Sequence, residues 1–560
     1  MTGMPKPWVG PMDVILSIIG EVFKNGFVKN CVLEFVGPGV ENLSMDFRNG
    51  IDTMTTESTC LSSLWTTDAK TEEYFAIHGR PEDYKEMKPD DAALYDKVIE
   101  VNLDTIEPVI ALPFHPSNVY SLKEIIADPK EALSIIDKNA KRTFENNPNV
   151  HWNLAGKIHD DGKLYVDQGV IAGCCSGSFE NLYAVGKMAE YMNHGVGSFN
   201  FNVYPASQPI MTALMDYGVR VKSAFCGPCF GAGDTPANNE FSIRHTTRNF
   251  PNREGSNPAM NQFSCVALMD SRSIAATSFN GGKLTSAEDV WQDITYPKYH
   301  FNSQIYENTV YNGFKKAEKD VEMVYGPDIR DWPDMTELAD DLLLKVASVI
   351  HDEVTTTDEL IPSGETASYR SNPEKISAFT LIRKDPKYVG RAKTVREFER
   401  ARLKGDEKTA MEYFSILEKA GIFVPKDRLM NHTGIGSVLY AKRPGDGSAR
   451  EYAASCQKVL GGFANICIEY ATKRYRSNCV NWGILPFTYG TDPIDLQPGE
   501  YIYLSNIRNS VEKGLTEVEA TVISEDGKTR VMKLNLPDVT EAEKQVLLAG
   551  SLINFYKLGK

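Results

Sequence analysis

Two cysteines separated by two residues are the feature of this sequence most suited to chemistry. Cys226 and Cys229 lie in the segment Ala224-Phe-Cys-Gly-Pro-Cys-Phe-Gly-Ala-Gly-Asp234. Such a pair can be a redox-active dithiol, half of a zinc site or two ligands of an iron–sulfur cluster. A structural zinc ion needs four ligands, and no second pair stands at the spacing of a tetrahedral site. The residues after Cys229 are typical of a loop, whereas a helix is expected there in a thioredoxin-type redox site.

A third cysteine could complete a set of iron ligands. Cys174 lies in the segment Ile171-Ala-Gly-Cys-Cys-Ser-Gly-Ser178, with Cys175 directly after it. Three thiolates on a four-iron cluster leave one iron open for a substrate. Ten cysteines in 560 residues are too few for a disulfide scaffold, so we expect reduced thiols. Spacing alone leaves two hypotheses open, a cluster site and a set of buried structural cysteines.

Arginines form the second candidate group for chemistry. Arg244, His245, Arg248 and Arg253 fall within ten residues, and Arg370 and Arg450 stand in other turn-rich segments. A guanidinium group can hold a carboxylate through two parallel hydrogen bonds. The chain has 60 Lys+Arg and 75 Asp+Glu, a net charge of −15, so a local arginine cluster must hold any anionic ligand against the overall field. The alternative hypothesis is that each arginine is a solvated surface charge.

Alternating strands and helices are expected to position these residues. A strand at Leu164–Ala172 leads into the cysteine loop Gly173–Gly177 and a helix from Ser178 to Met192. A strand at Ser198–Val203 precedes a helix from Gln208 to Tyr217. This alternation is typical of parallel sheets covered by helices, in which ligands bind in the loops that follow the strands. The predicted fold class is therefore α/β.

Local signals predict further elements near both ends of the chain. They are a helix at residues 11–26, a strand at Val32–Val36, a helix at Val395–Ala420, a hairpin at Val518–Leu536 around Asp526-Gly527, and a last helix opened by the capping box of Thr540 and Glu543. A polar stretch from Pro327 to Asp334 is typical of a linker. The last third of the chain is therefore expected to form a separate α/β domain.

Composition excludes several classes of protein. Hydrophobic residues make up 42% of the chain and charged residues 24%, which are ordinary values for a globular protein. The chain has no apolar run of membrane-spanning length and no visible secretory signal, so we expect a cytoplasmic protein without a membrane partner. The net charge of −15 argues against general nucleic-acid binding.

In combination, these motifs resemble the aconitase superfamily of iron–sulfur hydro-lyases. Cys226-Gly-Pro-Cys229 is similar to the ligand pair of that family, and Ala172-Gly-Cys174 to its first-ligand loop. Thr247-Arg248-Asn249-Phe-Pro-Asn-Arg253 resembles the family's Asn-Arg-Asn-Phe-x-Gly-Arg, and Gly447-Ser-Ala-Arg-Glu451 resembles Gly-Ser-Ser-Arg-Glu. Further similar segments are Thr53-Met-Thr-Thr-Glu57, Thr357-Asp358, Arg370-Ser-Asn and Ile484-Leu-Pro. The resemblance runs from about Pro5 to Tyr556.

The resemblance implies a multidomain, aconitase-like α/β architecture. Residues 1–112 would form a core domain similar to the second domain of the family, and residues 113–326 a core domain with the cluster cysteines. Residues 327–340 would be the linker, and residues 341–560 a swivel-like α/β domain. These boundaries are expectations drawn from the family pattern.

The resemblance also implies a set of site residues. Cys174, Cys226 and Cys229 would bind a [4Fe–4S] cluster, with Cys174 chosen over Cys175 because it directly follows Gly173. Ser448 would be the base that removes a proton alpha to a carboxylate, with Arg450 stabilising its alkoxide. The remaining members are the carboxylate-binding residues Arg248, Arg253, Arg370 and Arg450, and the acidic residues Glu57 and Asp358.

The activity implied is the reversible dehydration and rehydration of a citrate-like tri- or dicarboxylic hydroxy acid, as in the tricarboxylic acid cycle. Related isomerases are alternatives: homoaconitase, methylcitrate or methylisocitrate dehydratase, and isopropylmalate isomerase. Two other classes remain open. One is a non-catalytic protein that binds RNA when cluster-free, against which the charge of −15 weighs. The other is a thiol–disulfide enzyme that uses Cys226 and Cys229.

The sequence departs from the family pattern at several positions. The differing residues are Cys175, Ser176, Thr247, Asn252 and Ala449. The family's N-terminal domain, with an Asp-Ser-His element and the proton-donating histidine, has no match, so we expect a truncated or split enzyme whose missing domain or subunit comes separately. His245 is the histidine nearest to Arg248, and we expect it to be a satisfied loop residue rather than the acid.

Overall fold

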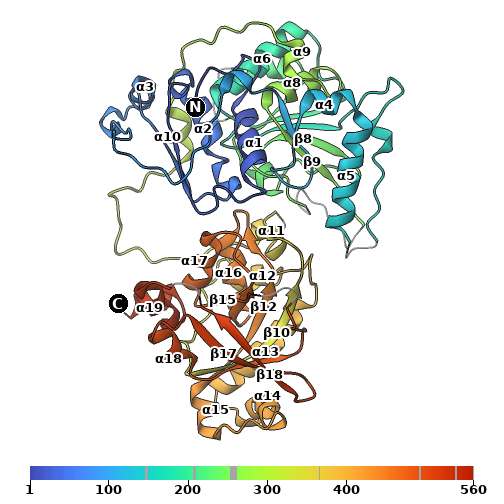
Figure 1. Ribbon diagram of the computed structural model, residues 1–560. Helices are drawn as coiled ribbons and strands as arrows, with labels where there is room; N and C mark the ends of the chain where they lie inside the picture. Colours follow the sequence, from blue (N-terminus) through green and yellow to red (C-terminus); the bar gives the residue numbers. More distant parts are fainter. Residues whose placement is uncertain are drawn as a thin grey trace. The chain divides into compact units, whose positions relative to one another are not determined.

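The computed structural model describes residues 1–145, 149–205, 210–251, 261–364, 366–490, 494–536 and 539–558, with no side-chain description for residue 305. The chain divides into two compact units, Met1–Val324 and Tyr325–Lys560 (Figure 1). Each is described by itself. The expected division of residues 1–326 into two core domains stays a prediction, as does the extent of the linker.

The first unit is built on a seven-stranded sheet. In spatial order its strands are β4 (Val119–Ser121), β3 (Val109–Ala111), β9 (Cys265–Met269), β8 (Phe241–His245), β5 (Gln168–Ile171), β6 (Asn200–Val203) and β7 (Arg220–Val221). The five strands from β9 to β7 run parallel, and β3 is antiparallel to both of its neighbours. The carboxyl ends of the parallel strands therefore share one edge, where the loops with the cysteines and with Arg248 begin.

Helices cover both faces of this sheet. The helices of this unit are α1 (Pro11–Val22), α2 (Met45–Asp52), α3 (Ala69–Ile77), α4 (Leu122–Ala127), α5 (Pro129–Thr143), α6 (Phe179–Met192), α7 (Met211–Asp216), α8 (Ser271–Phe279), α9 (Ala287–Val290) and α10 (Gln304–Thr309). Ala267 and Met269 of β9 join the hydrophobic cluster of α4, α5, α6 and α8, whereas Leu268 joins the cluster of α1 and α2. This alternation assigns the two helix groups to opposite faces, because successive strand residues point to opposite sides. A small parallel pair, β1 (Val32–Phe35) with β2 (Ser62–Trp65), completes the unit.

The predicted elements of the first unit are largely confirmed. The helix expected from Ser178 to Met192 is α6, with Ser178 as its N-cap. The helix expected over residues 11–26 ends at Val22, and the strand expected at Leu164–Ala172 covers only Gln168–Ile171. That strand starts late because Tyr165 and Val166 donate their backbone N–H groups to Lys157 and Gly282, outside the sheet. Residues 206–209, at the start of the helix expected from Gln208, lie outside the described residues.

The second unit is built on a closed barrel. Its strands in spatial order are β10 (Asp341–Ile350), β12 (Thr433–Ala441), β14 (Gly462–Cys467), β15 (Leu485–Thr488), β18 (Thr529–Asn535), β17 (Glu517–Ile523) and β16 (Tyr501–Leu504). The first four run parallel, and the remaining pairings are antiparallel. Strands β17 and β18 form the hairpin predicted around Asp526-Gly527. The α/β class is confirmed for both units.

Helices and one short strand pair surround the barrel. The helices are α11 (Thr357–Leu360), α12 (Pro373–Ser377), α13 (Tyr388–Leu403), α14 (Glu407–Lys419), α15 (Lys426–His432), α16 (Arg450–Val459), α17 (Lys473–Asn481), α18 (Ile507–Glu512), α19 (Glu541–Ala549) and α20 (Leu552–Lys557). The strand pair is β11 (Thr355–Thr356) with β13 (Pro444–Asp446), which run parallel. The predicted capping box of α19 is present, since Thr540 Oγ1 accepts from Glu543 N at 3.2 Å and Thr540 N donates to Glu543 Oε2 at 2.9 Å.

The single helix expected at Val395–Ala420 is wrong. Two helices, α13 and α14, occupy this stretch and are separated at Gly405. Gly405 has φ of 75°, a left-handed conformation that glycine adopts without steric cost. Asp406 then caps α14 by accepting a hydrogen bond from Thr409 N at 3.2 Å. The end of α13 and the start of α14 were not predicted, because both helices have similarly polar outer faces and the charged residues form one continuous pattern.

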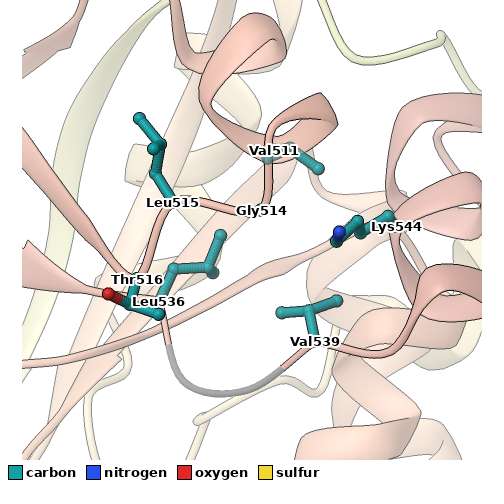
Figure 2. Close-up of a pocket in the computed structure, with 7 residues that line it drawn as sticks. All are labelled: Val511, Gly514, Leu515, Thr516, Leu536, Val539 and Lys544. Carbon is teal, nitrogen blue, oxygen red and sulfur yellow. The ribbon is translucent and has the colours of Figure 1, made fainter.

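A small cavity in the second unit is unrelated to the predicted site. It encloses about 140 Å³ between the end of α18 and the start of α19 (Figure 2). It is lined by Val511, Gly514, Leu515, Thr516, Leu536, Val539 and Lys544. The side chains drawn around it are mostly aliphatic, with the amine of Lys544 at one side. None of the candidate residues inferred from the sequence lines this cavity.

No helix within the described ranges is both long and apolar enough to cross a lipid bilayer. This agrees with the lack of a membrane-spanning run in the sequence.

A buried lysine on α16 makes the stability of the second unit depend on pH. Lys458 is 7% exposed, and its Nζ donates to Gly483 O at 3.4 Å and lies 4.2 Å from the centre of the Phe463 ring. Burial lowers the pKa of Lys458 to about 7, and the nearby Glu399 carboxylate opposes that shift. In the unfolded chain a lysine titrates near 10.4. The unfolded state therefore binds a proton that the folded state releases between about pH 7 and pH 10.

We expect Lys458→Met to stabilise the protein, by an amount that grows as the pH falls from 10 to 7. Protonation of the unfolded chain costs the wild type stability over this range, and the cost levels off below the folded pKa. Because one pKa unit corresponds to about 1.4 kcal/mol, the gain at neutral pH should be on the order of a few kcal/mol. Thermal unfolding at pH 7 and pH 10 measures it. Lys408→Met, on the exposed side of α14, is the control, and an equal gain at both pH values would contradict the expectation.

Candidate functional site

The first cysteine loop follows β5 directly. Gly173 has φ of 89°, and the Sγ atom of Cys229 lies 2.7 Å from the position that a Cβ atom on Gly173 would occupy. Any larger residue at position 173 would therefore collide with Cys229 as well as strain the backbone. Cys174, the next residue, is exposed. A glycine before Cys174 is thus what allows the two cysteine loops to approach each other.

The second cysteine loop forms one 3₁₀ turn. This turn, η6, spans Gly227–Phe230, and Cys229 N donates to Cys226 O at 2.9 Å. Chain reversal follows at Gly231, which has φ of 79°. Cys226 is exposed and Cys229 is buried. The turn is followed by loop rather than by a long helix, as the sequence predicts.

The three cysteines chosen from the sequence come together at this edge of the sheet. The pKa of Cys174 is raised by burial and by the neighbouring thiols of Cys229 and Cys226. The pKa of Cys226 is likewise raised by burial and by Cys229. These mutual effects require the three sulfur atoms to be within electrostatic range of one another. The thiols of Cys174 and Cys226 are consequently protonated at neutral pH.

Three cysteine thiols are a donor set that the ligands of an iron–sulfur cluster can take. Within the described ranges, no group of three or more histidine, cysteine or acidic side chains is arranged to hold one ion. The three ligands of a four-iron cluster each bind a different iron atom, so their sulfurs stand farther apart than ligands around one ion. The thiols of Cys174, Cys226 and Cys229 come from two loops at the same edge of the sheet.

Cys175 lies beneath the predicted ligands. Its side chain is fully buried, whereas that of Cys174 is exposed. The neighbouring thiol of Cys229 and burial raise the pKa of Cys175 well above its usual value. The sulfur atoms of Cys175 and Cys229 also approach one carbonyl oxygen, that of Ala172, at 3.8 and 3.6 Å. Sequence spacing does not reveal this contact, because it joins residues from different loops.

Arg244 is neither a carboxylate-binding arginine nor a solvated surface charge, the two hypotheses for the arginine cluster. Its side chain is fully buried, so it is not a surface charge. Its guanidinium donates to Ser242 Oγ at 3.0 Å, to Gln168 Oε1 at 3.0 Å and to Pro228 O at 3.4 Å, and it also bonds the carbonyl of Asp234. Arg244 therefore ties the loop that contains Cys226 and Cys229 to β5 and β8. Its position within a strand is the sequence signal for such a structural role.

Arg248 and Glu57 form an ion pair in the first unit. Arg248 Nη2 lies 2.5 Å from Glu57 Oε1, although the two residues are far apart in sequence. The Arg248 side chain is 15% exposed, and its Nη1 donates to Thr247 Oγ1 at 3.1 Å. The charge of Arg248 also reaches Cys174, where it lowers the pKa of the thiol against the larger effect of burial. Arg253 belongs to residues 252–260, outside the described ranges.

His245 is buried at the end of β8. Its Nδ1 accepts a hydrogen bond from Ser271 N at 3.0 Å and is paired with Ser271 Oγ at 2.7 Å. Burial lowers the pKa of His245 to about 4, so the ring is neutral at neutral pH. Its Nε2 has no hydrogen-bond partner among the described residues. The expectation of a satisfied histidine therefore holds for one ring nitrogen only.

The remaining candidates lie in the second unit, at the start of α16. Gly447 has φ of 118°, and the exposed Ser448 follows it. Arg450 is the first residue of α16, and its Nη1 donates back to Gly447 O at 2.7 Å. Ala449 N donates to Thr357 Oγ1 at 3.2 Å, which joins this turn to α11. Ser448 thus stands beside an arginine and the positive end of a helix, both of which favour an anion.

Asp358 and Arg370 are connected to the same region. Asp358 is 4% exposed, and its Oδ1 accepts from Ser363 N at 3.3 Å. Arg370 Nη2 donates to Ser363 O at 3.5 Å, and its guanidinium lies 5.6 Å from the centre of the Tyr452 ring on α16. The structure therefore brings together Asp358, Arg370 and Arg450, which the sequence separates by up to 92 residues. Thr357 was noted only as part of a motif, whereas its hydroxyl joins two of the loops.

A family model and several curated proteins match parts of this chain. Residues 1–276, which contain the cysteines and Arg248, match the model of the aconitase family (aconitate hydratase). The mitochondrial aconitate hydratase of Arthroderma benhamiae is 26% identical over 599 residues, which cover 99% of this chain and 70% of that protein. That of Aspergillus fumigatus is 26% identical over 559 residues, which cover 92% of this chain and 64% of that protein.

A second kind of relative matches a shorter region. The 3-isopropylmalate dehydratase large subunit of Clostridium kluyveri is 28% identical over 302 residues, which cover 52% of this chain and 61% of that protein. This chain thus spans between 61% and 70% of the length of the three relatives. A solved structure of a 3-isopropylmalate dehydratase from Methanocaldococcus jannaschii is 17% identical in sequence to the region it matches. The match covers 39% of this chain and 95% of that protein. Its TM-score of 0.24 is too low to describe the fold further.

Proposed function

This chain belongs to the aconitase superfamily, and from that premise we propose that it is the larger part of a hydro-lyase that acts on a citrate-like hydroxy acid through a [4Fe–4S] cluster. The relatives named above are hydratases and dehydratases. Reversible loss and return of water would move a hydroxyl group between neighbouring carbons of a tri- or dicarboxylate. The substrate and the cofactor are both part of the proposal.

In the first unit, Cys174, Cys226 and Cys229 would hold the cluster and Arg248 would bind a substrate carboxylate. When bound, the cluster supplies a Lewis-acidic iron for the substrate hydroxyl and carboxylate. The three thiols must lose their protons to become ligands, and the raised pKa values of Cys174 and Cys226 make the loss of their protons coincide with iron binding. Arg248 already holds one carboxylate, that of Glu57, so a second carboxylate could share its guanidinium.

In the second unit, Ser448 would take the proton alpha to a carboxylate. A serine acts as a base only when its alkoxide is strongly stabilised. Arg450 and the first backbone N–H groups of α16 supply positive charge beside it. Arg370 would hold another carboxylate of the substrate, and the buried Asp358 would orient the loop between them through Ser363 N.

A separate domain or subunit would supply the acid for the departing hydroxide. Ser448 handles only one of the two protons in a dehydration. His245 is buried and its pKa is lowered to about 4, so at neutral pH its ring is not in the imidazolium form that could act as the acid. We therefore include in the proposal a partner that carries the Asp-Ser-His element of the family. Small carboxylates, rather than nucleic acids, remain the proposed ligands because of the net charge of −15.

The convergence of the three thiols at the ends of β5 and η6 is the observation that carries this proposal. The experiment is anaerobic purification of the full chain and reconstitution with ferrous iron and sulfide. Broad visible absorbance with matching iron and sulfide contents is expected. Dehydration of citrate, isocitrate and 2-isopropylmalate is then assayed with and without a separately produced Asp-Ser-His domain, which should raise the activity.

Two outcomes would overturn the proposal. Colourless, iron-free protein after reconstitution would exclude the cluster, and a salt-sensitive RNA shift of that protein would favour the non-catalytic binding class instead. Full activity of the isolated chain, retained in a His245→Ala variant, would exclude the need for a partner. Preference for 2-isopropylmalate over citrate would move the proposed substrate from a tricarboxylate to a dicarboxylate.

We expect Arg370→Lys to weaken citrate binding by about 1.5–3 kcal/mol, the range for a hydrogen bond to a charged group. Lysine keeps the positive charge but lacks the planar pair of donors that matches a carboxylate. Isothermal titration of the reconstituted, complemented enzyme measures the change. Arg400→Lys, a partly exposed arginine of α13, is the matched control. Equal affinities in both variants would show that Arg370 does not bind the substrate.

A further inference from the structure

The two residues that follow Arg370 are held by part of the stretch that the sequence predicts to be a linker. Arg330 N donates a hydrogen bond to Ser371 O at 2.9 Å. Asn372 Nδ2 donates to Asp328 Oδ1 at 3.4 Å. This part of the predicted linker therefore contacts two consecutive residues of the loop between α11 and α12, one through the backbone and one through a side chain.

The second of these contacts reaches the cap of a helix. Asn372 is 6% exposed and is the N-cap of α12, where its Oδ1 accepts from Lys375 N at 3.1 Å. Lys375 Nζ in turn donates to Asp328 Oδ1 at 2.5 Å. Because the chain turns into a helix at the N-cap, Asp328 helps to set the path of the backbone between Arg370 and α12.

The bracing segment, residues 328–332, is also anchored at its other end. The ring centres of Trp332 and Trp482 lie 4.5 Å apart, and Trp482 is buried. Trp482 Nε1 donates to Oε1 of Glu451, in the first turn of α16, at 2.5 Å. The segment therefore connects the loop of Arg370 with the start of α16, the two places in this unit where candidate site residues lie.

We propose that the bracing segment is a positioning element of the candidate site, in which Asp328 and the backbone N–H of Arg330 hold the loop so that the Arg370 guanidinium keeps one orientation. This rests on the proposed function, in which Arg370 binds a substrate carboxylate. The two parallel hydrogen bonds between a guanidinium and a carboxylate require matched planes. A displaced backbone at Arg370 would tilt that plane. Asp328 and Arg330 act only through the loop and touch no substrate.

The exposure of the ion pair indicates that its effect is local. The side chains of Asp328 and Lys375 are 43% and 53% exposed. An ion pair with this exposure contributes little to the free energy of unfolding, because water and salt screen it. Loss of Asp328 should therefore loosen the loop that it contacts and leave the barrel folded.

Hydrogen exchange of the full-length chain tests the proposal in the variant Asp328→Ala. Amide exchange at residues 366–375 should become faster by about 2- to 10-fold, the ratio that corresponds to one net hydrogen bond. Exchange in strand β12 of the barrel should stay unchanged. Asp331→Ala is the matched control, because it removes the same charge from the same segment, and Asp331 Oδ1 accepts from Tyr325 Oη at 2.7 Å. This measurement does not depend on the proposed function.

A second pair of variants isolates the backbone contact. Arg330→Pro removes the N–H group that donates to Ser371 O, whereas Arg330→Ala keeps it. Only the proline variant should show faster exchange at residues 366–375. This pair decides the question if Asp328→Ala fails to fold. Equal exchange in each variant and its control, or faster exchange in β12 as well as in the loop, would overturn the proposal.

Steady-state kinetics of the reconstituted, complemented enzyme connects the segment with the site. Asp328→Ala should raise KM for isocitrate about 2- to 10-fold and leave kcat within about a factor of two, because it weakens substrate binding and not proton transfer. Asp331→Ala should change neither parameter. Faster exchange with an unchanged KM would overturn the role in substrate binding. If the complemented wild type is inactive, the proposed function fails, and the exchange results still decide whether the segment holds the loop.

Discussion

Replacement of Cys174, Cys226 or Cys229 by serine, one at a time, is expected to abolish retention of the cluster. Three thiolates are the minimum that hold a four-iron cluster while one iron stays open. A serine hydroxyl at neutral pH is not ionised and does not replace a thiolate as a ligand. Iron and sulfide content after anaerobic reconstitution and desalting is the measurement. Each variant should lose essentially all of the iron that the wild type keeps.

Three buried cysteines away from the site are matched controls for this experiment. Cys60, Cys265 and Cys479 are each 0% exposed. Their serine variants should lose some stability, since a buried thiol is replaced by a more polar group, but they should keep the cluster. The structure adds a sharper control in Cys175, which lies beneath the ligands. If Cys175→Ser loses its iron and Cys174→Ser retains it, the first ligand is Cys175 and not Cys174.

Ser448→Ala is expected to reduce kcat of the complemented enzyme by roughly 10²–10⁴-fold, the usual contribution of a positioned proton-transfer group. The KM should change little, because Ser448 is proposed to act on a C–H bond and not on a carboxylate. Initial rates with isocitrate, measured over a range of concentrations, separate the two parameters. Cluster content should equal that of the wild type, since Ser448 and the cysteines belong to different units.

An exposed serine provides the matched control for this prediction. Ser415 on α14 is exposed and bonds only the helix backbone at Glu412 O in the described structure, so Ser415→Ala should leave kcat unchanged. A small effect of Ser448→Ala, within a factor of two or three of the control, would exclude Ser448 as the base. A parallel rise in KM without loss of kcat would instead assign Ser448 to substrate binding.

Much of the local structure follows from sequence signals that act over a few residues. The capping box of Thr540 and Glu543 and the turn at Asp526-Gly527 depend on contacts between near neighbours. Each was therefore predictable from residue types alone. The helix expected at Val395–Ala420 failed because the signal of Gly405 and Asp406 was weaker in the pattern than the surrounding charges.

The identities of the candidate site residues were also available from the sequence, because their motifs are short. The arrangement of those residues was not. The sequence presents Cys226 and Cys229 as a pair, and the fold in addition places the Cys229 sulfur against Gly173 of the other cysteine loop. It presents Arg244 as one of a group of anion-binding arginines, whereas the fold buries it beneath the cysteine loop.

By itself, then, the sequence determined the α/β class, the local elements and the residues with chemical potential, since periodicity, caps and turns depend on contacts within about one turn or one hairpin. Only the tertiary structure decided that Cys229 lies against Gly173 of the other cysteine loop, that Arg248 pairs with Glu57, and that His245 is neutral. Those outcomes depend on strand order and burial, which bring distant residues into contact and remove them from water. Hydrogen bonding and pKa follow from that environment and not from residue type.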